Sequence, residues 1–493
     1  MLSKIKHTLS KSTFLRGLQC SKSLYLNRYH PELRDELGAA QEAVFQRGHD
    51  VGMLARDLFP GGEDSSPVNR DYAAAVERTR ELIKKGVKVI YEAAFLFNGI
   101  LCLADILVKK GRKWKIYEVK SSTGLKDVYL PDAAVQYYVI TGVGLAVSDI
   151  SIVYLNNQYV RQGGLDLAQL FTIESVKKQV IGLQGFVAEQ AAAMKKILAG
   201  KKVPDIDIGP QCSDPYGCDF TGHCWAHVPE VSVFSLARLN GNRKFDLYNS
   251  GVLKLEDIPE EYDLTARQEI QVNAHVSGRR HIDKNEIRRF LESITYPHYY
   301  MDFETFMPAV PLFDNARPYQ QVPFQFCVYY RKSKRTRPEL REFLAQAGSD
   351  PREEFIRALI TATPAPGPIL VYNKSFEATR LKELASDFPA YADELNERRD
   401  RLLDLLEPFQ KGYYYAPSMN GSASIKVVLP ALVKDLSYHG LAVSDGGMAM
   451  QAFEHLWTET DPARVEEIRA QLLEYCKMDT FGMVRIVEEL GRV

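Results

Sequence analysis

The sequence predicts a mixed α/β protein of more than one domain, and three observations support this. The chain has 493 residues, which is long for one domain. Residues 1–226 alternate helical and strand patterns and end in a cysteine-rich segment, and a second apolar block with strand patterns begins near residue 296. We therefore expect a first domain over 1–226, a helical, charged connector over 227–295, and a second domain over 296–493. The hydrophobic content of 45% and the charged content of 25% permit sizeable cores in both domains.

Charge and targeting patterns set few limits on partners. The formal net charge is -1, but the runs KKGRKWK (109–115) and RKSKRTR (331–337) are dense in cations, and each reads either as a solvated hairpin turn or as a phosphate contact.

The segment MLSKIKHTLSKSTF lacks the apolar core of a signal peptide. The apolar run near 133–147 is interrupted by polar residues and glycines, so we expect no membrane partner. Seven cysteines without an extracellular signature indicate a reducing cytoplasm.

In the first domain, residues 101–123 read as a β-hairpin that carries charged side chains. Asp105 lies on the first strand, and Glu118 and Lys120 lie two apart on the second strand, hence on one face. Gln136 lies on the helix that follows, and Glu92 in VIYEAAF is a possible upstream acid. An ordinary amphipathic hairpin with a Glu/Lys ion pair is the alternative interpretation.

The acid followed by Glu-x-Lys after a turn resembles the core of PD-(D/E)XK nucleases, and Gln136 matches the glutamine of RecB-like members. The resemblance implies that Asp105 and Glu118 bind a divalent ion and that Lys120 positions or activates a water near the phosphate. His49, in FQRGHDVGMLARDLFP, is a weaker candidate for the metal-binding histidine of that group, because the local pattern puts Gly52 nearer its place.

Four cysteines flank this hairpin in the sequence. Cys20 precedes it in LRGLQCSKSLYL, whereas Cys212, Cys218 and Cys224 follow it in QCSDPYGCDFTGHCW. An arrangement of one cysteine before the hairpin and three after it resembles the iron–sulfur staple of RecB-like nucleases. This resemblance implies a 4Fe–4S cluster. The gap between the first two of the three is longer here than is usual for those relatives. A zinc site made by the same thiolates is the alternative. The other cysteines (Cys102, Cys327 and Cys476) read as core residues.

The second domain opens on three strand patterns, YPHYYMDFETF, VPFQFCVYYRK and LREFLAQ, with hairpin signals at NARP and KSKRTRP. A helix over 352–363, a buried strand over 369–373, a helix from Phe376 and a closing helix over roughly 462–490 follow. This order is typical of a ribonuclease-H-like fold. It is not a Rossmann order, because no glycine fingerprint follows a first strand.

Within YYMDFETF, Asp302 and Glu304 share one strand face, where two neighbouring carboxylates repel and are costly to bury. Tyr475 and Asp479, in EYCKMD, are four apart and so share one helix face. Glu377 enters the first turn of the helix that follows the buried strand ILVYN.

These three motifs resemble the DnaQ-like DEDD exonucleases of the tyrosine subclass, since Glu474 stands where the histidine subclass has histidine. The resemblance implies that Asp302, Glu304, Glu377 and Asp479 hold two magnesium or manganese ions and that Tyr475 orients or helps to deprotonate the attacking water. The second motif usually carries aspartate, so Asp404 in RLLDLLEPF competes with Glu377 as the fourth ligand.

Taken whole, the chain resembles a bacterial family of uncharacterised proteins that join a RecB-like, cysteine-bearing nuclease domain to a DnaQ-like domain. The resemblance implies a metal-dependent nuclease with two sites that act on single-stranded DNA ends. The C-terminal site would trim 3′ to 5′, and the N-terminal site would cleave from the 5′ side or internally. An RNA-processing exonuclease and a nucleic-acid-binding scaffold with one degenerate core are the alternatives.

Overall fold

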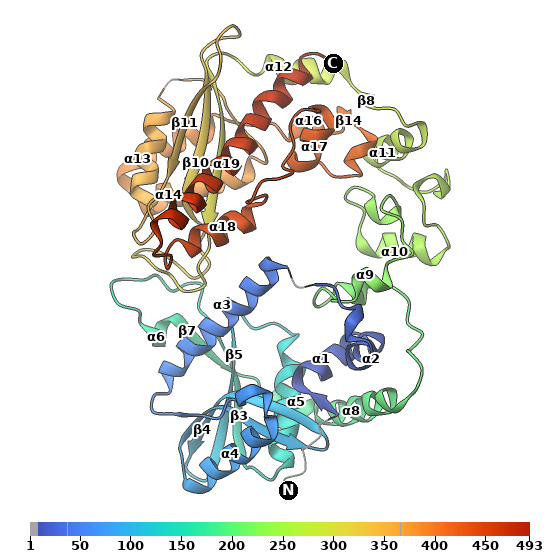
Figure 1. Ribbon diagram of the computed structural model, residues 1–493, viewed down its shortest axis with the longest axis vertical. Helices are drawn as coiled ribbons and strands as arrows, with labels where there is room; N and C mark the ends of the chain where they lie inside the picture. Colours follow the sequence, from blue (N-terminus) through green and yellow to red (C-terminus); the bar gives the residue numbers. More distant parts are fainter. Residues whose placement is uncertain (1–7, 37, 365) are drawn as a thin grey trace. The chain divides into compact units, whose positions relative to one another are not determined.

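The computed structural model describes residues 8–36, 38–364 and 366–493, and it is a mixed α/β protein with several sheets, as predicted (Figure 1). The chain divides into two compact units. Unit 1 comprises Met1–His227 and Ala309–Tyr319, and unit 2 comprises Val228–Pro308 and Gln320–Val493. The residues that we expected to form a connector therefore pack with the C-terminal residues in unit 2.

Unit 1 is built on a sheet in the order β2-β3-β4-β5-β6-β7, with β1 paired to β4. Its strands are β1 (Leu9–Ser10), β2 (Glu63–Asp64), β3 (Val89–Phe97), β4 (Ile100–Lys110), β5 (Lys113–Lys120), β6 (Val147–Leu155) and β7 (Phe171–Ser175). The predicted hairpin over 101–123 is confirmed as the antiparallel pair β4–β5. Gly111, at φ 62°, lies in its turn, where a left-handed residue is needed. The run 109–115 therefore comprises the turn of this hairpin and the adjoining ends of β4 and β5.

A crossover helix fixes the position of the β5 side chains. Strand β5 runs parallel to β6, and helix α5 (Tyr129–Gly142) connects them. The apolar residues of α5, among them Ala133, Val139 and Ile140, are buried in the main core of unit 1. This explains the apolar run near 133–147. In the described part of the chain, no helix combines the length and hydropathy that a membrane span requires. The other helices of unit 1 are α1 (Lys11–Gln19), α2 (Ser21–Tyr29), α3 (Ala39–Ala55), α4 (Tyr72–Lys85), α6 (Leu167–Leu170), α7 (Lys177–Gly182), α8 (Gln184–Ala199) and α9 (Thr221–Cys224).

Unit 2 contains a five-stranded sheet in the order β11-β10-β9-β12-β13. Its strands are β9 (His298–Phe306), β10 (Val322–Arg331), β11 (Glu339–Leu344), β12 (Ile369–Val371) and β13 (Leu402–Asp404). The first three are antiparallel, whereas β12 is parallel to β9 and β13. The predicted meander is thus confirmed, as is the turn at 332–338. The antiparallel pairing of β9 with β10 that NARP signalled is also confirmed, but the connection is not a tight hairpin turn: it runs over residues 307–321, and 309–319 pack in unit 1.

The helices of unit 2 cover the two faces of its sheet. Met301 and Phe303 of β9 pack with Phe355 of α13 (Arg352–Ala362) and Leu381 of α14 (Ser375–Asp387). The opposite face of β9 contacts α18 (Gly446–His455) and α19 (Pro462–Leu490). The remaining helices are α10 (Gly241–Asn249), α11 (Ala266–Ser277), α12 (Lys284–Glu292), α15 (Ala392–Asp400), α16 (Glu407–Gln410) and α17 (Ile425–Leu432), and a small sheet pairs β8 (His281–Ile282) with β14 (Tyr414–Tyr415).

Candidate functional site

The acids of YYMDFETF lie beneath helix α19. Asp302 and Glu304 point to the face of β9 that α19 covers, and possible ligand atoms of Asp302, Glu304 and Cys476 all lie within 4.8 Å of one another. Because Tyr475 and Asp479 are on the same helix, the structure brings the first and last predicted motifs together. Tyr475 forms a hydrogen bond with Asp479. Burial raises the pKa of the Cys476 thiol, which favours a neutral packing role for this residue.

Glu377 reaches the same group of acids from the first turn of α14. The side chain is 1% exposed, and its Oε2 atom has no hydrogen-bond partner among the described residues. Asn373, at φ 74°, turns the chain into the helix, where the Ser375 hydroxyl donates to Asn373 Oδ1 over 2.7 Å. An unpartnered, buried carboxylate oxygen is costly, so this atom indicates a missing ligand.

Asp404, the competing fourth ligand, has a different role in the described structure. Its Oδ1 atom accepts hydrogen bonds from the backbone N–H groups of Asn373 (3.0 Å) and Leu406 (2.9 Å). Asp404 therefore shapes the two loops at the ends of β12 and β13. Its charge still contributes to raising the pKa of Glu377.

The cluster carries more negative than positive charge. Burial raises the pKa of all four acids. The charge of Asp479 adds to this shift at Asp302, and the charge of Asp302 adds to it at Glu304 and Glu377. Lys426 opposes the shift at Asp302, Glu304 and Asp479. A mutual increase of this kind indicates that the acids face one another without enough neutralising charge.

Two further residues of this site were not identified from the sequence. Tyr438 donates a hydrogen bond to Asp479 Oδ1. The Lys426 ammonium donates to the Ser444 carbonyl over 2.6 Å and lies 5.5 Å from the centre of the Tyr475 ring. Both residues lie in SIKVVLPALVKDLSY (424–438), where a lysine inside an apolar run was the available signal.

In unit 1, the structure brings Glu118, Lys120 and Gln136 together. The Lys120 ammonium donates to Glu118 Oε1 over 2.7 Å, and Gln136 Nε2 donates to Glu118 Oε2 over 2.7 Å. Asp105 lies on the adjacent strand, where its Oδ2 accepts from the Val119 N–H over 2.7 Å. The predicted residues thus form one group, which Gln136 joins from α5.

Lys11 and Asp132 complete this group, and neither was identified from the sequence. Lys11 Nζ donates to Glu118 Oε1 over 2.8 Å and lies 3.6 Å from Asp132 Oδ1, while Lys120 Nζ donates to Asp132 Oδ2. Burial lowers the pKa of Lys11, but the charges of Asp132 and Glu118 outweigh burial and raise it overall. Lys11 is far from the hairpin in sequence, so no local pattern indicates its position.

The group opens onto a cleft of about 380 Å³. Asp105, Glu118 and Lys120 line it together with residues of α3 and its C-terminal end, namely Val44, Phe45, Gly48, His49, Gly52, Met53 and Arg56. His49 and Gly52, the two positions weighed for a metal-binding histidine, therefore both face the cleft. Arg56 lies 3.4 Å from Glu92, which also lines the cleft and whose φ of 51° is unusual for glutamate.

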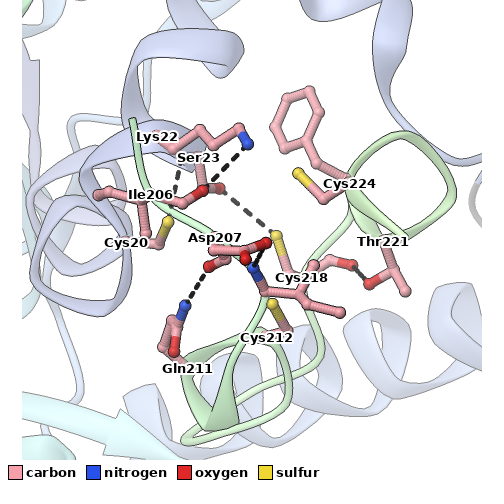
Figure 2. A pocket seen from close by; sticks show the side chains of 12 residues that line it. Cys20, Lys22, Ser23, Ile206, Asp207, Gln211, Cys212, Cys218, Thr221 and Cys224 are labelled. Carbon is pink, nitrogen blue, oxygen red and sulfur yellow. Dashed lines mark hydrogen bonds between the residues drawn. The ribbon is translucent and has the colours of Figure 1, made fainter. Parts of the chain in front are cut away.

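The four predicted cysteine ligands line one cavity, and Figure 2 shows their sulfur atoms around it. The hydroxyl of Ser23 accepts from Cys218 Sγ over 3.6 Å, and the Ser23 N–H donates to Cys20 Sγ over 3.5 Å. Burial raises the pKa of Cys224, and the other three thiols add to that increase. The structure thus brings together residues separated by nearly two hundred positions in the chain.

Comparisons with known proteins identify relatives of undetermined function. Residues 299–424 match a family model described as Domain of unknown function (DUF2779). An uncharacterized Mycoplasma pneumoniae protein, the MG366 homolog, is 25% identical over 220 residues, which are 41% of this chain and 33% of that protein. The uncharacterized protein UU173 of Ureaplasma parvum is 27% identical over 209 residues, 38% of this chain and 30% of the relative. The chain thus spans about a third of the length of these curated relatives.

Proposed function

We propose that this protein is a metal-dependent nuclease that hydrolyses phosphodiester bonds of single-stranded DNA, with a 3′–5′ exonuclease site in a ribonuclease-H-like, DnaQ-like unit 2. One observation carries the proposal. Four carboxylates from β9, α14 and α19 converge in a buried site with raised pKa values, and Glu377 Oε2 lacks a hydrogen-bond partner among the described residues.

The donor set suits magnesium or manganese, because carboxylate oxygens are the hard ligands that these ions prefer. Asp302, Glu304, Glu377 and Asp479 would hold them. When bound, two such ions activate a water and stabilise the leaving 3′ oxygen. The chain's own residues would contribute orientation: the Tyr475 hydroxyl, which interacts with Asp479, would hold the attacking water, and Tyr438 would fix the Asp479 carboxylate by donating to Oδ1.

The test is cleavage of end-labelled, single-stranded DNA and matched RNA with manganese. We expect wild-type protein to shorten the 3′ end and Asp302→Asn to lose this activity. A preference for RNA in direct competition would contradict the DNA assignment. Retention of 3′ trimming at the wild-type rate by Asp302→Asn would contradict the assignment of the site.

We assign a second, PD-(D/E)XK-type site to unit 1, where Asp105 and Glu118 would hold a divalent ion and Lys120 would position the water. Its support is that all three line one cleft and that Gln136 holds Glu118 from α5. The alternative, a degenerate core that only binds nucleic acid, is favoured by the two ammonium groups that already neutralise Glu118. Lys120→Ala tests these alternatives. If Lys120→Ala abolishes a cleavage activity that Asp302→Asn retains, a second active site is supported. If Lys120→Ala leaves cleavage unchanged, the degenerate core is supported.

The cavity of Cys20, Cys212, Cys218 and Cys224 would hold a four-thiolate metal centre, and the resemblance to RecB-like nucleases favours a 4Fe–4S cluster. Among the described residues, no three of these sulfurs lie within 4.8 Å of one another, whereas tetrahedral zinc with bonds of about 2.3 Å places its sulfurs about 3.8 Å apart. The cavity volume of about 20 Å³ is closer to the size of one ion. The sulfur spacing favours the cluster, because thiolates must reach the metal whatever the volume between them.

Purification without oxygen tests this centre. A brown protein with an iron content that Cys20→Ser abolishes and Cys102→Ala leaves unchanged is the expected result. A colourless protein with stoichiometric zinc would replace the cluster with the zinc alternative.

A further inference from the structure

A cavity in unit 2, of about 460 Å³, is lined by two arginines and by no acidic side chain. Its lining includes Arg238, Arg267, Tyr372, Asn373, Leu406 and Ile425. Neither arginine forms an ion pair with a carboxylate in the described ranges of the chain. Arg267 donates one hydrogen bond, from Nη1 to the Gln410 carbonyl, while its buried Nε atom has no partner among the described residues.

The two guanidinium groups are held close together despite their repulsion. Burial lowers the pKa of Arg267, and the charge of Arg238 lowers it further. Arg238 also has a φ of 54°, a strained value for a residue with a side chain. Two like charges and a strained backbone at one cavity persist only where the surrounding structure enforces them, and such positions concentrate at ligand sites.

Two buried glutamines of α11 enforce this arrangement. Gln271 Oε1 accepts from the Ala237 N–H over 2.9 Å, and Gln268 Nε2 donates to the Ala237 carbonyl over 2.9 Å. The residue before Arg238 is thus fixed by the same helix that carries Arg267. Gly421 packs against the same segment, since a Cβ there would lie 2.1 Å from the Ser235 carbonyl oxygen and 2.8 Å from the Gln271 side chain.

The cavity adjoins the candidate nuclease site. Asn373 and Tyr372 line it, and Asn373 begins the turn into α14, four residues before Glu377. The Asn373 N–H also donates to Asp404. An anion held by the two arginines would therefore lie beside the acids without entering their cluster.

We propose that Arg238 and Arg267 bind a phosphate group of the nucleic-acid strand and so position the strand for hydrolysis at the Asp302 cluster. Guanidinium groups bind phosphate through paired, charge-assisted hydrogen bonds, and both arginines line the cavity. The apolar wall of Leu406 and Ile425 and the Tyr372 ring leave room for the adjoining nucleoside. This inference rests on the proposed nuclease function, and it adds positioning residues to it.

The test measures binding of a fluorescent single-stranded oligonucleotide to full-length protein without divalent metal, across a salt series. We expect Arg238→Gln and Arg267→Gln each to weaken binding about tenfold, as for one charge-assisted hydrogen bond. Each substitution should also reduce the salt slope by about 0.7, the value for one single-strand phosphate. Arg288→Gln, an exposed arginine of α12, is the control and should bind like wild type.

Arg238→Lys separates geometry from charge, because it keeps the salt slope and loses the paired hydrogen bonds. Thermal melting checks that each variant is folded, and Arg238 is exposed, so its replacement should not affect folding. Competition with a free mononucleotide distinguishes the source of the phosphate: displacement only by polynucleotide supports the proposal, and equal displacement by mononucleotide contradicts it.

Wild-type affinity and slope in both glutamine variants would overturn the phosphate site while leaving the nuclease proposal standing. Absence of any oligonucleotide binding by wild type would also overturn the phosphate site. Cleavage assays of the same samples separate the two failures, because Asp302→Asn tests the acids alone.

Discussion

The two acidic clusters differ in where their neutralising charge comes from. In unit 1, Glu118 and Asp132 contact the ammonium groups of Lys11 and Lys120 directly, and Arg56 lies by Glu92. In unit 2, the four acids around Asp302 face Lys426, and their pKa values are raised.

A buried acid needs a counter-charge, and in unit 1 the chain supplies it directly to Glu118 and Asp132, although burial still raises the pKa of Asp105 and of Glu92. In unit 2 the balance requires cations from solution. The comparison therefore predicts that unit 2 depends on divalent ions for both activity and stability, whereas unit 1 keeps its arrangement without them.

The largest expected effect is at Asp302. We expect Asp302→Asn to slow 3′ trimming more than about a thousandfold, since losing even an outer partner of a metal ligand typically costs ten- to a hundredfold. Initial rates on 3′-end-labelled DNA with manganese measure this. Glu466→Gln, an exposed acid on α19, is the matched control. Trimming near the wild-type rate would place the chemistry elsewhere.

The second effect concerns the fourth ligand. Glu377→Gln should reduce trimming about a hundredfold, because the unpartnered Oε2 atom is the one available for an ion. Asp404→Asn should stay within a few-fold of wild type, because an asparagine oxygen still accepts from Asn373 and Leu406. The reverse pattern would assign the ligand to Asp404.

The third prediction concerns how much the lysine ion pairs stabilise unit 1. Lys120→Met should lower the free energy of unfolding by about 2 kcal/mol, below the range for a fully buried pair because the side chain is 20% exposed. Lys115 lies on the same strand as Lys120 and pairs over 3.5 Å with Asp149 of β6, and Lys115→Met should cost about 0.5 kcal/mol. Urea denaturation of the unit 1 transition compares them. If the two substitutions lowered the free energy of unfolding equally, the Lys120 contacts would stabilise the unit no more than the Lys115 pair does.

The smallest effect is a pH dependence in metal-free protein. Because the folded pKa of Asp302 lies above its ordinary value of about 3.9, the folded state holds the extra proton, and stability falls as pH rises above that value. Metal-free Asp302→Asn should therefore become more stable than wild type, by about 1 kcal/mol at pH 7, and the difference should vanish near pH 4. Melting in chelator across pH measures it. A pH-independent difference would contradict the mutual repulsion of the acids.

Local patterns in the sequence predicted much of the fold. The alternation in YYMDFETF placed Met301 and Phe303 on one side and Asp302 and Glu304 on the other, as found. The long connection after β9 was missed, because NARP is a good turn signal and its contacts, such as Arg161 with the Pro311 carbonyl, are distant in sequence.

In the candidate sites too, local sequence patterns indicated some residues, whereas others depend on contacts between residues distant in sequence. Spacing placed the predicted acids correctly on strands and helix faces, but Lys11, Asp132, Lys426 and Tyr438 reach their sites only through tertiary packing. The arginine cavity was also not indicated, since Arg238 and Arg267 become neighbours through the glutamines of α11.

Calorimetric titration of manganese into metal-free protein tests the central claim most directly, because it asks whether the acids of unit 2 bind the cations that their charge requires. We predict saturable binding that raises the melting temperature of wild type and of Lys120→Met. Asp302→Asn should lose the binding at the unit 2 site. Wild-type stoichiometry and affinity in Asp302→Asn, or no binding by wild-type protein, would contradict it.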